Sequence, residues 1–356
     1  MQAGICWNIL IFICTLILAF VSVPPVIKLA LKIKAVDRPE KRKVHSRLMP
    51  RLGGLAIFVP FTLVMALMGK FYGPYTGIIL GGSIIFLVGA LDDIFGLSAW
   101  VKLGGQIIAA LVAIHYGVIV HFVTNPFDGY LDLGMLSLPL TLLWIVGVSN
   151  AINLIDGLDG LAAGVSAIAA ITMGIIAFNE GLFGAAGVAL ILVAAILGFL
   201  PYNFYPAQTF MGDGGSNFLG FILACMAVMG TAKSAALISL LVPLVILGIP
   251  IFDTFFAIIR RIHKKQPIFS PDKDHLHHRL MALGVSHRRT VLIIYAISIV
   301  FGAISVTMTF ISGPKALMVI ALLMLAVVLG AGRIGLMSGG KNADAQQVGK
   351  PRGIEF

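Results

Sequence analysis

The chain has 356 residues, of which 59% are hydrophobic and only 11% are charged. Soluble domains carry roughly a quarter charged residues, so this composition excludes an ordinary soluble protein and predicts one whose solvent is lipid. The formal net charge of +10 would suit nucleic acid. The basic residues stand beside apolar runs, however, which favours anionic headgroups and anionic substrates and argues against nucleic acid.

Apolar runs of about 20 residues, the length that crosses a bilayer as a helix, recur along the whole chain. The first run lacks the basic segment and the cleavage site of a signal peptide, so we interpret it as a membrane helix. The fifth is the least clear because its apolar part is short. In chain order the expected spans are 5–27, 52–69, 74–91, 102–123, 135–152, 161–178, 182–202, 216–232, 235–257, 290–311 and 314–334. The sequence therefore predicts an all-α polytopic membrane protein with about eleven transmembrane helices.

The basic residues orient these spans. Nine Lys and Arg residues lie within 28–51, and eight lie within 260–289. The positive-inside rule places both segments in the cytoplasm, and the eight spans between them agree with that placement. The N-terminus is then outside and the C-terminus cytoplasmic, and of the 25 basic residues only Lys70, Lys233 and Lys315 fall on the outer side.

The domain organisation is simple. We expect a single integral membrane domain over 1–335 and a disordered cytoplasmic tail over 336–356, because the tail is rich in Gly, Lys and Gln. The cysteines Cys6, Cys14 and Cys225 lie in apolar runs and offer neither a disulfide framework nor metal spacing.

Acidic residues gather in the predicted inner loops, where the positive-inside rule does not require them. Asp92 and Asp93 end the third span. Adjacent carboxylates repel each other unless a cation is near, and a hairpin of the third and fourth spans would bring Lys102 back beside them. A solvated helix end is the plainer interpretation, and a metal-binding or phosphate-handling site is the sharper one.

A second polar group follows the fifth span. Asn150, Asn153 and Asp156 are three residues apart, which places them on one face of a helix, and Asp159 follows. Amide and carboxylate oxygens together suit a hard cation such as Mg²⁺. Helix capping would also use Asn and Asp, but four polar groups exceed the needs of one cap.

A third acid, Asp213, lies among glycines in the segment 211–216 (MGDGGS), just before a span. Glycines let the backbone approach a phosphate closely, and a helix N-terminus favours anions. Such a turn is weak evidence alone, but it gains weight beside two other acidic loops on the same side.

Histidines appear in the second basic segment, as HLHHR at 275–279. A zinc site would lack a cysteine partner, so phosphate binding or proton transfer suits this segment better. A lipid-surface role for the whole basic loop is the alternative, and it is the default for the polybasic segment that holds His45 and Arg47. Asp253, at the inner end of the ninth span, would pair with a basic neighbour such as Arg260 or support the site indirectly.

These motifs, in this order, resemble the polyprenyl-phosphate N-acetylhexosamine-1-phosphate transferase superfamily, which is of the glycosyltransferase family 4 type. The resemblance runs from about Lys28 to Arg289. The strings at 150–164 and 270–279 are most similar to the WecA/TagO branch, and so is an eleven-span topology. The MraY branch has ten spans and three consecutive histidines, whereas Leu276 interrupts the run here.

The resemblance implies an activity. The chain would transfer N-acetylhexosamine 1-phosphate, most commonly GlcNAc 1-phosphate, from a UDP-sugar to undecaprenyl phosphate and release UMP. The reaction would need Mg²⁺, with Mn²⁺ as an alternative, at the cytoplasmic face of the bacterial inner membrane, as the first membrane step of cell-envelope glycopolymer synthesis. Membrane lipids are expected partners, and a homodimer is left open. The competing class is a secondary transporter of an anionic solute, but transporters place ionisable residues near the midplane and show inverted repeats.

The resemblance also implies residue roles. Phe210 would stack on uracil, Asn203 would contact the nucleoside, and Asp92, Asp93 and Lys102 would face the lipid phosphate. The catalytic candidates are Asp92, Asp93, Lys102, Asp156, His277 and His278. The substrate-binding candidates are His45, Arg47, Asp159, Asn203, Phe210, His275 and Arg279. The metal-binding candidates are Asn153 and Asp213.

Overall fold

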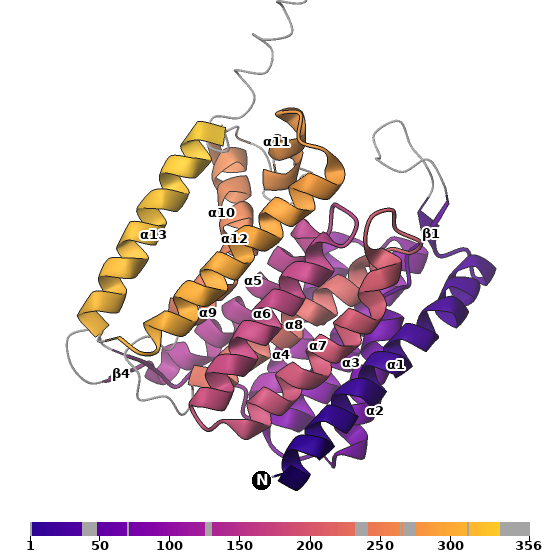
Figure 1. Cartoon of the computed structure of the whole chain (residues 1–356), viewed down its shortest axis with the longest axis horizontal. Coiled ribbons are helices and arrows are strands. Elements are labelled where there is room, and N and C mark those ends of the chain that lie inside the picture. The colour runs from indigo at the N-terminus through magenta and orange to yellow at the C-terminus, as the bar shows by residue number, and fades with distance from the viewer. Residues whose placement is uncertain are drawn as a thin grey trace, which may run out of the picture.

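The computed structural model describes residues 2–37, 48–69, 71–124, 130–231, 241–263, 265, 275–311 and 313–334. Within these ranges the chain forms a bundle of helices that run roughly alongside one another (Figure 1). The elements in chain order are α1 (Gln2–Lys32), β1 (Val36–Asp37), β2 (Met49–Pro50), α2 (Leu55–Leu67), α3 (Pro74–Phe95), α4 (Ala99–His115), β3 (Phe122–Thr124), β4 (Tyr130–Asp132), η1 (Gly134–Leu136), α5 (Ser137–Ile155), α6 (Leu161–Asn179), α7 (Phe183–Asn203), α8 (Gly212–Thr231), α9 (Leu241–Ile246), α10 (Gly248–His263), α11 (Leu276–Ala282), α12 (His287–Met308) and α13 (Gly313–Ile334).

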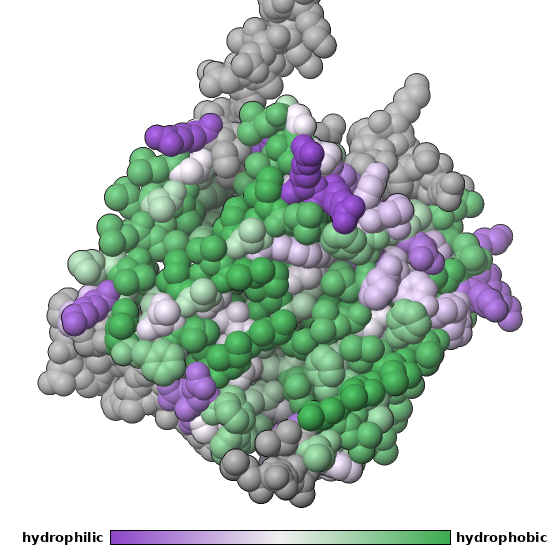
Figure 2. All heavy atoms as spheres, viewed as in Figure 1, coloured by the Kyte–Doolittle hydropathy of each residue, from purple (hydrophilic) through white to green (hydrophobic). Residues whose placement is uncertain are grey.

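The helices follow the apolar runs of the sequence, as expected for a polytopic membrane protein. Eight helices of the described chain are long and apolar enough to cross a membrane, and α2 and α4 are shorter apolar helices. In lipid the backbone must satisfy its own hydrogen bonds, which a helix does within one segment. The face shown in Figure 2 is mostly hydrophobic, with hydrophilic residues towards its edges. The fold is therefore that of a multi-pass helical membrane protein.

Three details differ from the sequence-based expectation. The span expected over 102–123 ends as a helix at His115, because Gly117 turns the chain with a φ of 97°. The strands β3 and β4 then form an antiparallel ribbon, and β1 pairs with β2, so the chain is not entirely helical. The span expected over 235–257 is interrupted between α9 and α10 at Leu247, just before Gly248 and Pro250. The expected disordered tail 336–356 lies outside the described residues.

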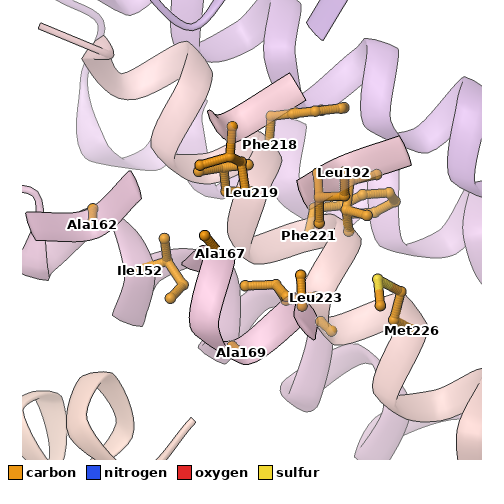
Figure 3. Close-up of a cluster of buried hydrophobic side chains, with 14 of the residues drawn as sticks. Ile152, Ala162, Ala167, Ala169, Leu192, Phe218, Leu219, Phe221, Leu223 and Met226 are labelled. Carbon is orange, nitrogen blue, oxygen red and sulfur yellow. The ribbon is translucent and has the colours of Figure 1, made fainter. Parts of the chain in front are cut away.

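Helix α8 lies at the centre of the bundle. It packs against α3 and α5, and 89% of its spanning window is buried inside the protein. Figure 3 shows part of this core, where Phe218, Leu219 and Phe221 of α8 lie among side chains of neighbouring helices such as Ile152 and Leu192. A helix buried on nearly all sides has a fixed position, so a polar residue at its end is fixed as well.

The N-terminus of α8 approaches α3 closely because glycines line the contact. A Cβ atom at Gly89 of α3 would lie 2.5 Å from Cα of Gly214. Gly212 begins α8 with a φ of 74°, where a side chain would also collide with the Asp93 carboxylate. These glycines let Asp93, one turn after Gly89, reach the first backbone amides of α8.

Candidate active site

Asp93 joins the end of α3 to the start of α8. Its Oδ1 accepts a hydrogen bond from the backbone N–H of Asp213 (3.0 Å), and its Oδ2 accepts one from Gly214 (3.1 Å). Both amides lie in the first turn of α8, where helical N–H groups lack partners within the helix. Asp93 is buried, so it acts as a cap from a neighbouring helix and fixes the position of Asp213.

Lys102 links two carboxylates, as the predicted hairpin of α3 and α4 requires. Its Nζ lies 2.9 Å from Oδ2 of Asp92 and 3.0 Å from Oδ2 of Asp213. Asp92 is held further by the backbone N–H of Leu97, which donates to its Oδ1 (2.7 Å). The expectation that Lys102 returns to the acid pair is thus confirmed, and Asp213 joins them from a motif more than 100 residues away.

Arg51 supplies a second cation that the sequence-based site did not include. Its Nε lies 3.6 Å from Oδ1 of Asp93, and its Nη2 lies 3.9 Å from Oδ1 of Asp213. Arg51 follows β2, whose pairing with β1 also brings Asp37 within 4.0 Å of the guanidinium. His45 and Arg47, the basic residues that were expected to bind substrate, lie outside the described residues.

The motif at the end of α5 adds two residues to those around Asp213. We call Asp92, Asp93, Lys102, Asn153, Asp156 and Asp213 the acid cluster. The side chain of Asn153 interacts with the Asp213 carboxylate. Asp156 follows directly after α5, and desolvation, together with the carboxylates of Asp213 and Asp93, raises the pKa of Asp156 to about 7. Asn150, by contrast, turns to Gln106, with which it exchanges two hydrogen bonds of 2.8 and 3.2 Å. The cluster therefore contains Asn153 and Asp156 but not Asn150.

Asp159 ties two loops together. Its Oδ2 accepts a hydrogen bond from the backbone N–H of Ala207 (2.9 Å), and its own N–H donates to Nε2 of His287 (3.1 Å). The His287 ring lies against Tyr205, with centroids 4.6 Å apart. His287 was not among the predicted site residues, because nothing in the sequence links it to Asp159.

Asn203 and Phe210 flank the same loop. Asn203 is buried and donates through Nδ2 to the backbone oxygen of Thr209 (3.0 Å), while its Oδ1 has no hydrogen-bond partner among the described residues. The backbone of Phe210 is fixed from both sides, since its N–H donates to Pro50 and its oxygen accepts from Gly53. The loop is thereby attached to the β2 region that carries Arg51.

The histidine motif forms α11 and is anchored to α10. Asp253, which was expected to pair with a basic neighbour such as Arg260, contacts His275, whose Nδ1 lies 2.8 Å from Oδ2 of Asp253. Oδ1 of Asp253 accepts from the backbone N–H of Leu276 (2.8 Å). The ring of His278 lies beside that of His277, with centroids 4.2 Å apart. The motif residue Arg279 follows one position later, on the same helix.

His277 connects this helix to the acid loop. It is buried, and a Cβ atom added at Gly157, the residue after Asp156, would lie 2.5 Å from its Nε2. Burial and the neighbouring His278 lower the pKa of His277 to about 3, so the ring is neutral at pH 7. The structure thus brings the second polar motif of the sequence and the histidine motif into contact at Gly157 and His277.

The donor set suits a magnesium ion that is shared with a substrate. Among the described residues, no three His, Cys, Asp or Glu side chains group into a ready-made metal cage. Mg²⁺ rarely needs one, because one or two carboxylates usually hold it together with substrate phosphates and water. Asp213 with Asn153 offers a carboxylate beside an amide, and the Lys102 ammonium 3.0 Å from Asp213 marks this point as favourable for positive charge.

Comparison with known proteins agrees with this geometry. Residues 75–231, which run from α3 to α8 and carry the acid cluster, match the family model described as glycosyl transferase family 4. The chain is 48% identical over 292 residues, 82% of each chain, to the probable undecaprenyl-phosphate N-acetylglucosaminyl 1-phosphate transferase of Bacillus subtilis (strain 168).

Two further relatives extend the similarity. The chain is 38% identical to the decaprenyl-phosphate N-acetylglucosaminephosphotransferase of Mycobacterium tuberculosis (strain CDC 1551 / Oshkosh), over 81% of this chain and 80% of the relative. It is 31% identical to the undecaprenyl-phosphate alpha-N-acetylglucosaminyl 1-phosphate transferase of Salmonella typhi, over 79% and 78%. With its acid cluster inside the matched region, the chain belongs to the polyprenyl-phosphate N-acetylhexosamine-1-phosphate transferase family.

Proposed function

We propose that this protein transfers GlcNAc 1-phosphate from UDP-GlcNAc to undecaprenyl phosphate and releases UMP. The relatives in Bacillus and Salmonella are named undecaprenyl-phosphate N-acetylglucosaminyl 1-phosphate transferases, which supports the transferred group and the lipid acceptor. The observation that carries the proposal is the setting of Asp213. This carboxylate is fixed by Asp93 and faces Lys102 and Arg51, in the segment that matches the family model. A transporter has no support among the relatives.

The charges of the site suit two polyanionic substrates. A phosphate oxygen of the lipid attacks the sugar-linked phosphorus of UDP-GlcNAc, and the bond to the bridging oxygen of UMP breaks. Lys102 and Arg51 lie where they can offset the repulsion between the phosphates. Because a phosphate monoester has its second pKa near 6, the lipid phosphate is largely ionised at pH 7 and needs little help from a general base.

Magnesium completes the proposed site. Asp213 and Asn153 would hold it, with Asp156 nearby as a further carboxylate. When bound, the ion would neutralise the diphosphate and stabilise the leaving UMP. Mn²⁺ is expected to substitute. His275 is engaged with Asp253, so within the motif His277, His278 and Arg279 are the better candidates to contact phosphate or sugar.

The finer topology is part of the proposal. Eleven spans result if α2, α4 and the α9–α10 pair cross the membrane along with the eight longer helices. The positive-inside rule then places the N-terminus outside and the C-terminus and the acid cluster in the cytoplasm, at the bacterial inner membrane. A water-soluble UDP-sugar would meet the lipid phosphate at the inner headgroup layer, and the product would enter cell-envelope glycopolymer synthesis.

The test is an assay of UMP release. Purified protein in detergent is mixed with UDP-GlcNAc, Mg²⁺ and undecaprenyl phosphate, and we expect UMP together with a lipid-linked GlcNAc diphosphate. Asp213→Ala should abolish turnover, and Glu180→Gln, which alters an exposed acid after α6, is the matched control and should not. Absence of UMP with every UDP-N-acetylhexosamine, where a relative is active in parallel, would refute the proposed function.

A further inference from the structure

Three amide side chains meet inside the bundle, between α4, α5 and α8. Nε2 of Gln106 donates to Oδ1 of Asn150 (3.2 Å) and to Oδ1 of Asn217 (2.9 Å). Oε1 of Gln106 accepts in return from Nδ2 of Asn150 (2.8 Å). Gln106 and Asn217 are 5% and 3% exposed, so these amides are held away from solvent. We call Gln106, Asn150 and Asn217 the amide cluster.

Every amide nitrogen and oxygen of this cluster has a hydrogen bond. Nδ2 of Asn150 also donates to the backbone oxygen of Val146 (2.8 Å), and Nδ2 of Asn217 donates to the backbone oxygen of Asp213 (2.8 Å). Buried amides are costly when unpaired, whereas a fully paired network rigidifies its surroundings and favours one arrangement. Sliding or rotating any of the three helices would break at least one of these bonds.

Each member of the amide cluster lies one helical turn from a residue of the acid cluster. Gln106 follows Lys102 by four residues on α4, and Asn217 follows Asp213 by four residues on α8. Asn150 precedes Asn153 by three residues on α5. Residues three or four apart lie on the same face of a helix, so the position that the amides impose on three helices is passed directly to Lys102, Asn153 and Asp213.

We propose that the amide cluster positions the acid cluster, with Gln106 as the residue that joins the other two. Gln106 itself touches no reacting group, so it is a positioning residue. The inference rests on the proposed function for its kinetic consequences, but its structural part does not. The plainer alternative is that the three amides only stabilise helix packing. A stabilising role would lower the melting temperature without changing the metal dependence of the active protein.

The first variant is Gln106→Leu, which keeps similar bulk and removes all three hydrogen bonds. We expect kcat to fall about 10- to 100-fold and the Mg²⁺ concentration for half-maximal activity to rise about 10-fold, because Asn153 and Asp213 lose their register. The KM for UDP-GlcNAc should change much less. The control is Ser149→Ala, since Ser149 is fully buried on α5 beside Asn150 and its hydroxyl bonds within its own helix, to the backbone oxygen of Ile145.

A second readout does not depend on activity. The backbone amides of Asp213 and Gly214 are hydrogen-bonded to Asp93. Their hydrogen exchange should be faster in Gln106→Leu than in the unmodified protein, and it should be unchanged in Ser149→Ala. If Gln106→Leu does not fold, Asn217→Ala carries both measurements, because it leaves the pair of Gln106 and Asn150 intact. If the unmodified protein releases no UMP, the proposed function is overturned. The positioning role of Gln106 is then decided by hydrogen exchange of the Asp213 and Gly214 amides alone. Unchanged metal dependence with unchanged exchange overturns the inference.

Discussion

Two regions of this protein are held in place by different means. The acid region is formed by α3, α4, α5 and α8. The spanning window of α8 is 89% buried, and hydrogen bonds cross between the helices of this region. The histidine region, formed by α10 to α13, ends in a helix whose window is only 11% buried. An apolar cavity of about 260 Å³ lies between α10, α12 and α13, lined by residues such as Phe252, Phe301 and Leu323.

The polar anchor of the histidine region lies beside this cavity. Asp253 lines it and holds both the ring of His275 and the start of α11. The acid region is thus held by hydrogen bonds and ion pairs between several helices, whereas α11 packs against α12 and is anchored at its start by Asp253. The acid region and the histidine region should therefore respond separately to mutation.

Lys102→Met should have the largest effect. It removes the ammonium that lies 2.9 Å from Asp92 and 3.0 Å from Asp213, and two carboxylates are left facing each other. Loss of one fixed charge-stabilising group typically costs about 10²- to 10³-fold in rate, so we expect kcat to fall by that amount. UMP release at saturating Mg²⁺ measures it. A rate within threefold of the unmodified protein would show that Lys102 has no part in the chemistry.

Asp253→Ala should have a smaller and more selective effect. It leaves His275 and the first amide of α11 without their buried acceptor, at a cost of about 1–3 kcal/mol in stability. We expect kcat/KM to fall about tenfold while the Mg²⁺ dependence stays unchanged, because the acid region does not use Asp253. A shifted Mg²⁺ dependence would contradict the separation of the two regions.

How well the sequence predicts a contact in these regions depends on how many residues separate the two partners along the chain. The approach of Lys102 to Asp92 was predictable, because a hairpin of two spans brings them together within ten residues. The role of Asp93 was not, since its partners on α8 lie 120 and 121 residues away and the approach needs Gly89. Gln106, likewise, is a lone polar residue in an apolar run, and its partners become visible only once three helices are packed.

Arg51 and the break at Leu247 were missed for a different reason. Arg51 is one of nine basic residues in its segment, and only its place after the β1–β2 ribbon separates it from the others. The ninth span is a continuous apolar run in the sequence. Hydropathy indicates burial in lipid but does not indicate where a helix is interrupted, so the break between α9 and α10 was not predicted.

Gly157→Ala tests the point where the two regions meet. The added Cβ would lie 2.5 Å from Nε2 of the buried His277, so the ring must move. Overpacking of this kind costs about 1–3 kcal/mol, and we expect roughly tenfold lower kcat with little change in Mg²⁺ dependence. Gly187→Ala, with nothing within 4 Å of the added atom, is the matched control on α7. Equal activity of the two variants would mean that the contact is not used.

The smallest expected effect is a change in stability caused by Asp156→Asn. The pKa of Asp156 is raised to about 7, above its value of about 4 in an unfolded chain. The folded state therefore disfavours the charged carboxylate, a cost that is fully present above pH 7 and disappears as the pH falls towards 4. Without Mg²⁺, Asp156→Asn should stabilise the protein by about 1 kcal/mol at pH 8 and by about a third of that at pH 5. Melting curves at both pH values measure this. With Mg²⁺ the order should reverse at pH 8, because the ion favours the carboxylate, and an equal gain with and without Mg²⁺ would place Asp156 away from the metal.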